Sequence, residues 1–100
     1  MPITLCCLLW ANLGRRTDLH AYEDAVLALL RDHDAEIVQR AVSDGSDGSP
    51  HEIQFYAFAS QDALDDYLAD PRRLALSEER DRVVARTALF PVSLRPGPQT

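Results

Sequence analysis

The segment Ile3–Asn12 constrains the fold most, because it is apolar at nearly every position. Successive side chains of a strand point to opposite faces, and both alternating sets are apolar here. One set contains Ile3, Leu5, Cys7 and Leu9, and the other contains Cys6, Leu8 and Trp10. A strand of this kind is typical of a sheet that is covered on both faces. The sequence therefore predicts a sheet whose first strand is buried on both sides.

The next segments carry a helix and two strands. A stripe of apolar residues at helical spacing begins after Thr17, a residue type suited to cap a helix. The helix is expected to end near Asp34, because aspartate tolerates left-handed backbone better than most residues. Residues 36–42 and 52–59 alternate with a period of two, so we expect strands joined by a flexible loop.

The last third of the chain carries a broken helix and a final strand. Ser60 is suited to cap the helix, and Asp70-Pro71 interrupts it before it resumes and continues to about residue 85. The last strand is expected at 87–94, at an edge or bulge, because Pro91 cannot donate a ladder hydrogen bond.

The resulting order, β-α-β-β-α-β, predicts an α+β fold of the ferredoxin-like kind. In this fold one four-stranded antiparallel sheet carries both helices on one face. Residues 1–94 are expected to form this single domain, and residues 95–100 a C-terminal tail.

The helices of such a fold leave the other face of the sheet uncovered. We expect Ile53, Phe55, Ala57, Ala59, Ala88, Phe90, Val92 and Leu94 to lie beneath the helices, with Ile3, Leu5, Cys7 and Leu9. The opposite face would then carry Thr4, Cys6, Leu8, Trp10, Asn12, Arg40, Gln54, Tyr56, Phe58, Thr87 and Leu89. So large an apolar patch is unusual on a monomer. The expected partner is a second copy of the chain, in a homodimer through the open sheet face.

Charge excludes several other partners. Sixteen acidic residues against ten basic ones give a net charge of −6, whereas nucleic acids and anionic lipids require a positive surface. Every basic residue is an arginine, which excludes lysine-based catalysis. The apolar segment 3–11 is too short to span a bilayer and has no basic flank before it, so we expect no membrane contact and a cytoplasmic location.

Cofactor and metal motifs are absent from the sequence. It contains no GxGxxG, P-loop, CxxC, HExxH or GxSxG pattern, and no histidine pair with metal-ligand spacing. We therefore expect no cofactor and no metal, so any oxidation would draw its electrons from the substrate. The adjacent Cys6 and Cys7 are expected to be buried apolar groups, with a reactive thiol pair as the alternative.

Three segments carry a family resemblance: LLRDHDAEIVQRA at 29–41, EIQFYAFASQDALDDYLADPRRLAL at 52–76 and RTALFPV at 86–92. Together they resemble the dimeric α+β-barrel superfamily, which includes the antibiotic-biosynthesis monooxygenases. The resemblance implies a dimeric barrel and, for the monooxygenases, a cofactor-free cavity lined by polar and aromatic residues. The haem-degrading relatives carry a histidine on the second helix, and residues 61–85 contain none.

This resemblance implies a cofactor-independent monooxygenase- or isomerase-like enzyme that acts on a small aromatic or polyketide-like molecule. The alternative is a homodimer without catalytic activity, which binds a small hydrophobic ligand or is purely structural. The candidate catalytic residues are His33, Arg40 and Tyr56, and the candidate ligand-binding residues are Trp10, Asn12, Gln54 and Phe58.

Several of these candidates also have a structural interpretation. His33 is either a general base or a histidine held at a helix end. Arg40 either pairs with Glu52 on the neighbouring strand or holds an anionic oxygen of the ligand. Trp10 and Phe58 either form a flat wall for the ligand or fill the core of the dimer.

Overall fold

The four strands form one antiparallel sheet, described here over residues 2–98 from a computed structural model. The strands are β1 (Ile3–Ala11), β2 (Ala35–Val42), β3 (Glu52–Phe58) and β4 (Val84–Pro91), in the spatial order β2-β3-β1-β4. This is the order of the ferredoxin-like fold, so the predicted fold class is confirmed.

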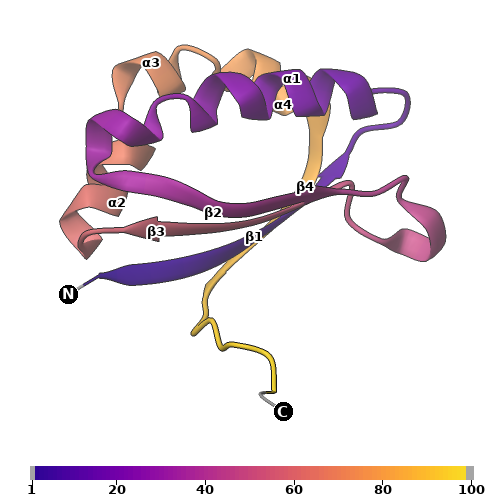
Figure 1. Cartoon of the computed structure of the whole chain (residues 1–100). Coiled ribbons are helices and arrows are strands. Elements are labelled where there is room, and N and C mark those ends of the chain that lie inside the picture. The colour runs from indigo at the N-terminus through magenta and orange to yellow at the C-terminus, as the bar shows by residue number, and fades with distance from the viewer. Residues whose placement is uncertain (1, 99–100) are drawn as a thin grey trace.

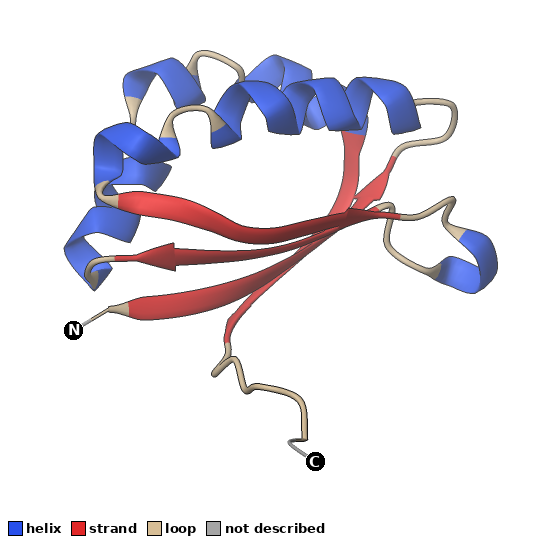
Figure 2. Cartoon of the chain, viewed as in Figure 1, coloured by secondary structure: helices blue, strands red, loops and turns tan. Residues whose placement is uncertain are grey.

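The helices pack against one face of this sheet (Figures 1 and 2). They are α1 (Arg16–Leu27), α2 (Gln61–Leu68), α3 (Pro71–Leu74) and α4 (Ser77–Val83), with a short 3-10 helix, η1 (Leu30–His33), after α1. A second 3-10 helix, η2 (Ser46–Gly48), lies away from this layer in the loop between β2 and β3 (Figure 1). Within residues 2–98, no helix combines the length and apolar composition needed to cross a bilayer.

The predicted helix boundaries rest on local capping, and three of them are confirmed. The Ser60 hydroxyl accepts a hydrogen bond from the Ala63 amide at 3.1 Å, which caps α2. The Asp70 carboxylate accepts one from the Arg72 amide at 2.8 Å and caps α3, with Pro71 in the first turn. Asp34 adopts left-handed backbone, with φ of 51°, where η1 ends.

Other boundaries differ from the prediction. The helix expected to run to Asp34 leaves α geometry after Leu27, because the Leu29 amide bonds Val26 and tightens the chain towards 3-10 geometry. The segment 71–85 divides into α3 and α4. The last strand begins at Val84, where it pairs with Ala11 of β1 directly after α4.

The sheet register corrects the predicted faces of β3. Leu5 and Cys7 of β1 are buried beneath the helices, as predicted. Their cross-strand partners are Tyr56 and Gln54, which therefore share that covered face, and Phe58 lies there too. The prediction that Gln54, Tyr56 and Phe58 lie on the face opposite the helices is wrong. The alternation in β3 does not show which set of side chains faces the helices, because both sets contain aromatic residues.

The same correction applies to β4. Leu89 pairs with Cys7 and lies on the helix side, whereas Phe90 pairs with Cys6 on the other side. The expectation that Phe90 packs beneath the helices is wrong, and Leu94 lies beyond the strand, half exposed.

We call the side of the sheet away from the helices the open face. Its apolar residues are Cys6, Leu8, Trp10, Ile53, Phe55, Ala57, Ala88 and Phe90. It is therefore still strongly apolar, although five of these eight residues, Ile53, Phe55, Ala57, Ala88 and Phe90, were expected beneath the helices.

Phe58 is the largest fully buried side chain of the core. Its ring lies 5.3 Å from that of Tyr56 and 5.7 Å from that of Tyr67, between centroids, so it joins β3 to α2.

We predict that Phe58→Ala lowers the free energy of unfolding by about 3–5 kcal/mol, because it removes a buried ring and leaves a cavity. Urea denaturation followed by circular dichroism measures the change. Leu13→Ala is the matched control, because Leu13 is fully exposed in the turn after β1, and its change is expected to stay within about 0.5 kcal/mol. Equal effects of the two substitutions would contradict the assignment of Phe58 to the core.

Candidate functional site

A cavity of about 270 Å³ lies between the covered face of the sheet and the helices. Its polar and aromatic lining consists of Cys7, Glu23, Gln54, Tyr56, Tyr67, Arg73, Arg80 and Thr87. Its aliphatic lining consists of Leu9, Val26, Leu27, Leu68 and Leu89. Small-molecule sites have this composition, with mostly apolar walls and a few convergent polar groups. We therefore take this cavity as the candidate site.

Glu23 places a carboxyl group in the cavity wall. It belongs to the buried face of α1 and is only 6% exposed. Burial raises the pKa of Glu23, because the charged form loses its hydration. The side-chain amide of Gln54 donates a hydrogen bond to Glu23 Oε1 at 2.8 Å, which fixes the orientation of the carboxyl group. A positioned carboxyl group with a raised pKa is suited to general acid–base chemistry near neutral pH.

A second buried carboxylate, Glu52, stands behind Gln54. The same Gln54 nitrogen donates to Glu52 Oε1 at 2.8 Å. Arg40 donates through both Nε and a terminal nitrogen, and His20 Nδ1 lies 2.6 Å from Glu52 Oε2. Burial by itself raises the pKa of Glu52, but these hydrogen bonds outweigh it and hold the pKa below its usual range. Glu52 is thus a fixed anion.

The pKa of Glu23 is therefore raised and that of Glu52 is lowered, although both carboxyl groups accept from the same Gln54 nitrogen. Glu52 has a cationic partner in Arg40, whereas the hydrogen bond that orients Glu23 comes from the neutral amide of Gln54. Pairs of titratable groups whose surroundings push their pKa values apart indicate distinct roles. Glu23 is the member that can gain and lose a proton.

Tyr56 and Cys7 lie side by side on adjacent strands in the same wall. Burial raises the pKa of the Tyr56 hydroxyl well above its ordinary value. Burial, together with the nearby Glu23 carboxyl group, raises the pKa of the Cys7 thiol to about 12. At neutral pH Tyr56 is therefore a hydrogen-bond donor, and the Cys7 thiol is not a nucleophile.

Two arginines line the cavity from the helical layer. Arg73 of α3 lies over the Tyr67 ring, with its guanidinium carbon 5.2 Å from the ring centroid. Arg80 of α4 donates a hydrogen bond to the Thr87 hydroxyl at 3.2 Å. The positive charge of these two groups is suited to stabilise an anionic or enolate oxygen of a ligand.

The structure brings only part of the predicted site together. Gln54 and Tyr56 line the cavity. Phe58 packs against Tyr56 in the core, outside the cavity lining. Arg40 lies behind Glu52 and also bonds Asp24, so the predicted pairing of Arg40 with Glu52 is confirmed.

The remaining predicted residues lie elsewhere. His33 Nε2 is 2.7 Å from Asp70 Oδ2, and its ring meets that of Tyr67 edge-on, which ties η1 to the junction of α2 and α3. Trp10 is on the open face and donates to the Gly48 carbonyl at 2.8 Å. Asn12 donates to a carbonyl at the end of α4, that of Arg82, at 2.9 Å. These contacts hold segments together and do not reach the cavity.

Sequence reasoning missed Glu23, Arg73 and Arg80. A signal for Glu23 was present, because it falls four residues after Leu19 on the apolar stripe of the helix, where a carboxylate is out of place. No comparable signal marks the arginines, because the breaks between α2, α3 and α4 decide which way they face.

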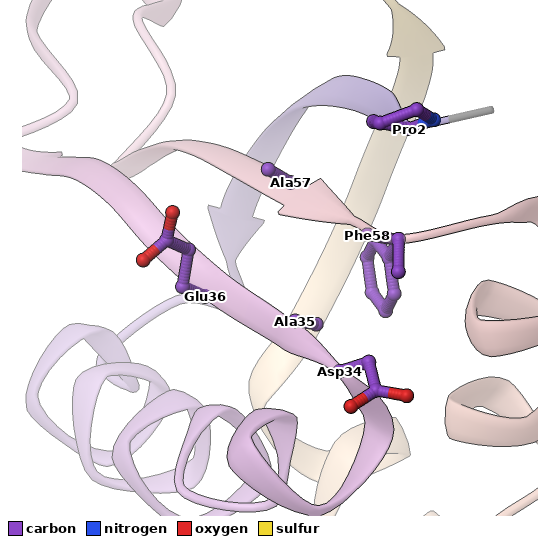
Figure 3. Close-up of a pocket in the computed structure, with 7 residues that line it drawn as sticks. Pro2, Asp34, Ala35, Glu36, Ala57 and Phe58 are labelled. Carbon is purple, nitrogen blue, oxygen red and sulfur yellow. The ribbon is translucent and has the colours of Figure 1, made fainter.

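A shallow depression of about 350 Å³ lies at the other end of the sheet, near Pro2 (Figure 3). Its two carboxylates, those of Asp34 and Glu36, point away from one another in Figure 3. Polar groups that diverge do not form a binding site, so this depression is not a candidate. In residues 2–98, no three His, Cys, Asp or Glu side chains are grouped to hold a metal ion.

Comparisons with known proteins identify the fold. No family model matches the chain, and no curated protein is significantly similar in sequence. Among solved structures, Rv0793 from Mycobacterium tuberculosis is 20% identical, with a TM-score of 0.71 over 98% of this chain and 100% of that one. SnoaB, a cofactor-independent oxygenase from Streptomyces nogalater, is 14% identical, with a TM-score of 0.69 over 98% of both chains.

A dimeric protein of unknown function with a ferredoxin-like fold, from Bacteroides fragilis, is 11% identical. Its TM-score is 0.72, over 93% of this chain and 96% of that one. These structural likenesses confirm the ferredoxin-like fold that the resemblance implied. Identities this low carry no activity across.

We predict that Glu23→Gln stabilises the protein at neutral pH. The pKa of Glu23 is higher in the folded chain than in the unfolded one, so the carboxyl group destabilises the fold increasingly as the pH rises above the unfolded value, and fully above the folded value. Glutamine keeps an oxygen for the Gln54 amide but carries no charge. The urea midpoint should therefore rise at pH 7, and the gain should shrink as the pH falls towards about 4, where the unfolded carboxyl group is protonated too.

The matched control is Glu78→Gln, at an exposed position of α4, which should change the urea midpoint little at either pH. A Glu23→Gln protein that is less stable than the parent at pH 7 would show that the ionised carboxylate is satisfied in the fold.

Proposed function

We propose that the chain is an enzyme that removes a proton from a carbon atom of a small aromatic molecule bound in this cavity. Such a step is shared by cofactor-independent monooxygenases and isomerases. The observation that carries the proposal is Glu23, a buried carboxyl group with a raised pKa that faces a cavity with aromatic walls. General bases are tuned in this way to work near neutral pH.

The step balances without a cofactor. Glu23 forms an O–H bond with the proton of a carbon next to a carbonyl group, and the electron pair of the broken C–H bond moves to the carbonyl oxygen as an enolate. The Tyr56 hydroxyl can donate a hydrogen bond to that oxygen, and the two arginines of the same cavity add a positive field around it. An isomerase returns the proton to another carbon. In a monooxygenase the enolate carbon forms a bond to one atom of molecular oxygen as co-reactant. Loss of water, which carries away the other oxygen atom and the two hydrogens of the former CH2 group, leaves a new carbonyl group.

The fold is compatible with this chemistry. SnoaB, which shares the fold, is a cofactor-independent oxygenase. Fold similarity at 14% identity supports the reaction class by analogy alone, so the argument rests on the residues of the cavity.

Two of the predicted site residues keep a role close to the one expected. Gln54 orients Glu23, and Tyr56 faces the ligand. We infer that Arg40 is a positioning residue, because it holds Glu52, which accepts from Gln54, which in turn donates to Glu23. His33 and Asn12 form hydrogen bonds that hold together the helical layer covering the cavity.

We predict that the protein exchanges the α-protons of a small aryl ketone with solvent deuterium, and that Glu23→Gln slows this exchange by about 10²–10⁴-fold. Loss of the α-proton signal of 1-tetralone in D₂O, followed by ¹H NMR, measures the rate. A charge-neutral glutamine keeps the shape of the site but cannot accept the proton.

Glu78→Gln provides the control for loss of a surface carboxylate and should retain the parental rate. If the parent and Glu23→Gln bind 1-tetralone equally and neither accelerates exchange, the alternative of a ligand-binding protein without catalytic activity is favoured.

We further infer that a second copy of the chain covers the open face. The open face carries eight apolar residues of β1, β3 and β4, and no helix of residues 2–98 covers it (Figure 1). Its centre is apolar, and Phe90 leaves 41% of its surface in water. The dimeric protein from Bacteroides fragilis that shares this fold supports the inference.

We predict that Phe90→Glu converts the dimer to a monomer, because a carboxylate on this face would be desolvated within the interface. Sedimentation velocity at micromolar concentration measures the change. Leu13→Glu, which places the same charge in the exposed turn after β1, should leave the dimer intact. A parent protein that sediments as a folded monomer would contradict the inference.

A further inference from the structure

We infer that the molecule bound in the cavity carries a carboxylate, and that Arg73 and Arg80 hold it. The inference rests on the proposed function only in using the same cavity, and it adds the chemical class of the ligand: a monocyclic or bicyclic aromatic acid. Three observations carry it, namely the state of each arginine, the contrast with the other arginines of the chain, and the walls between which the ring would lie.

The first observation is the hydrogen-bonding state of Arg73. Its Nε is buried and has no hydrogen-bond partner among residues 2–98. A buried donor without a partner costs about 1–3 kcal/mol, and more when it carries charge. The guanidinium lies against the Tyr67 ring, which holds its plane in place at the cavity wall. Arg73 is therefore a positioned donor with unused hydrogen-bonding capacity.

Arg80 is the second cation of the same wall. Its hydrogen bond goes to the Thr87 hydroxyl, which leaves the charge of its guanidinium uncompensated. In the part of the chain that the structure describes, neither Arg73 nor Arg80 forms an ion pair with a carboxylate.

The lack of an ion pair at Arg73 and Arg80 is informative when these residues are compared with the other arginines of the chain. The chain has an excess of acidic residues, with sixteen against ten basic ones, so carboxylates are plentiful. Arg40, the other partly buried arginine, contacts two of them. The other arginines without an ion pair among residues 2–98 are all exposed to solvent, namely Arg16, Arg31, Arg86 and Arg95. The two arginines of the cavity lack such partners although they are half-buried, where pairing matters more than at the surface. An anion from outside the chain satisfies both.

The rest of the cavity specifies what the anion is attached to. Tyr56 and Tyr67 contribute aromatic rings, and Leu9, Val26, Leu27, Leu68 and Leu89 contribute aliphatic surface. A cavity of about 150 Å³ accommodates benzene. The 270 Å³ available here therefore receives one ring with its substituents or two fused rings. A free inorganic anion would not cover the apolar walls of the cavity.

Isothermal titration calorimetry with 1-naphthoate and 1-naphthylmethanol tests the inference, because the two probes share a ring system and differ in charge. The parent protein should bind the carboxylate at least about 10-fold more tightly, since a hydrogen bond to a charged group contributes about 1.5–3 kcal/mol. Arg73→Met should lose about 10- to 100-fold in affinity for 1-naphthoate and little for the alcohol.

Arg80→Met is the second variant and should show the same selective loss, so the test does not depend on the folding of one protein. Arg95→Met, in the exposed C-terminal segment, is the control for loss of a positive charge and should bind like the parent. Circular dichroism and the urea midpoint establish that each variant is folded.

Equal affinities of the parent for the two probes would overturn the inference, as would unchanged 1-naphthoate binding in both folded variants. Absence of binding by either probe up to about 10 mM would overturn it too. The proposed proton transfer fails separately: Glu23→Gln should still bind 1-naphthoate. Retained anion binding without any ketone exchange counts against the reaction and leaves the anion site standing.

Discussion

The rest of the candidate site depends on the ion pair between Glu52 and Arg40. A fully buried carboxylate is tolerated only when it is paired and hydrogen-bonded, and Glu52 receives donors from Arg40, His20 and Gln54. Because Glu52 fixes the Gln54 amide, that amide is aimed at Glu23. One structural ion pair thus orients the side chain that we regard as the proton acceptor, through a chain of contacts that runs from β2 to α1.

This arrangement separates two tasks that a single carboxylate cannot perform. The pKa of Glu52 stays low because Arg40, His20 and Gln54 hydrogen-bond its carboxylate, and Glu23 keeps a raised pKa because burial is not offset by a paired cation. The ionised form of Glu23 works against folding, and the same property suits it to take up a proton. In the same cavity, Arg73 has a buried Nε without a hydrogen-bond partner among residues 2–98.

The covered and open faces divide the functions of the sheet. The covered face holds the polar and aromatic groups of the cavity, and the open face holds the apolar surface that we propose a second copy covers. Residues that the sequence placed in one site are therefore separated by the thickness of the sheet: Trp10 lies on the open face, while Tyr56 lies under the helices. A strand period alone does not decide between these faces when both sets are apolar, because either register buries similar surface.

The sequence by itself determined the order of elements, the cap at Ser60, the helix break at Asp70-Pro71, the left-handed turn at Asp34, and the pairing of Arg40 with Glu52. Each of these depends on neighbours along the chain or directly across one hairpin, where side-chain chemistry acts locally. Only the tertiary structure decided which face of β3 meets the helices, and that Glu23, Arg73 and Arg80 converge on one cavity. Those outcomes depend on the register of β3 against β1 and on the breaks between short helices, which distant contacts set jointly.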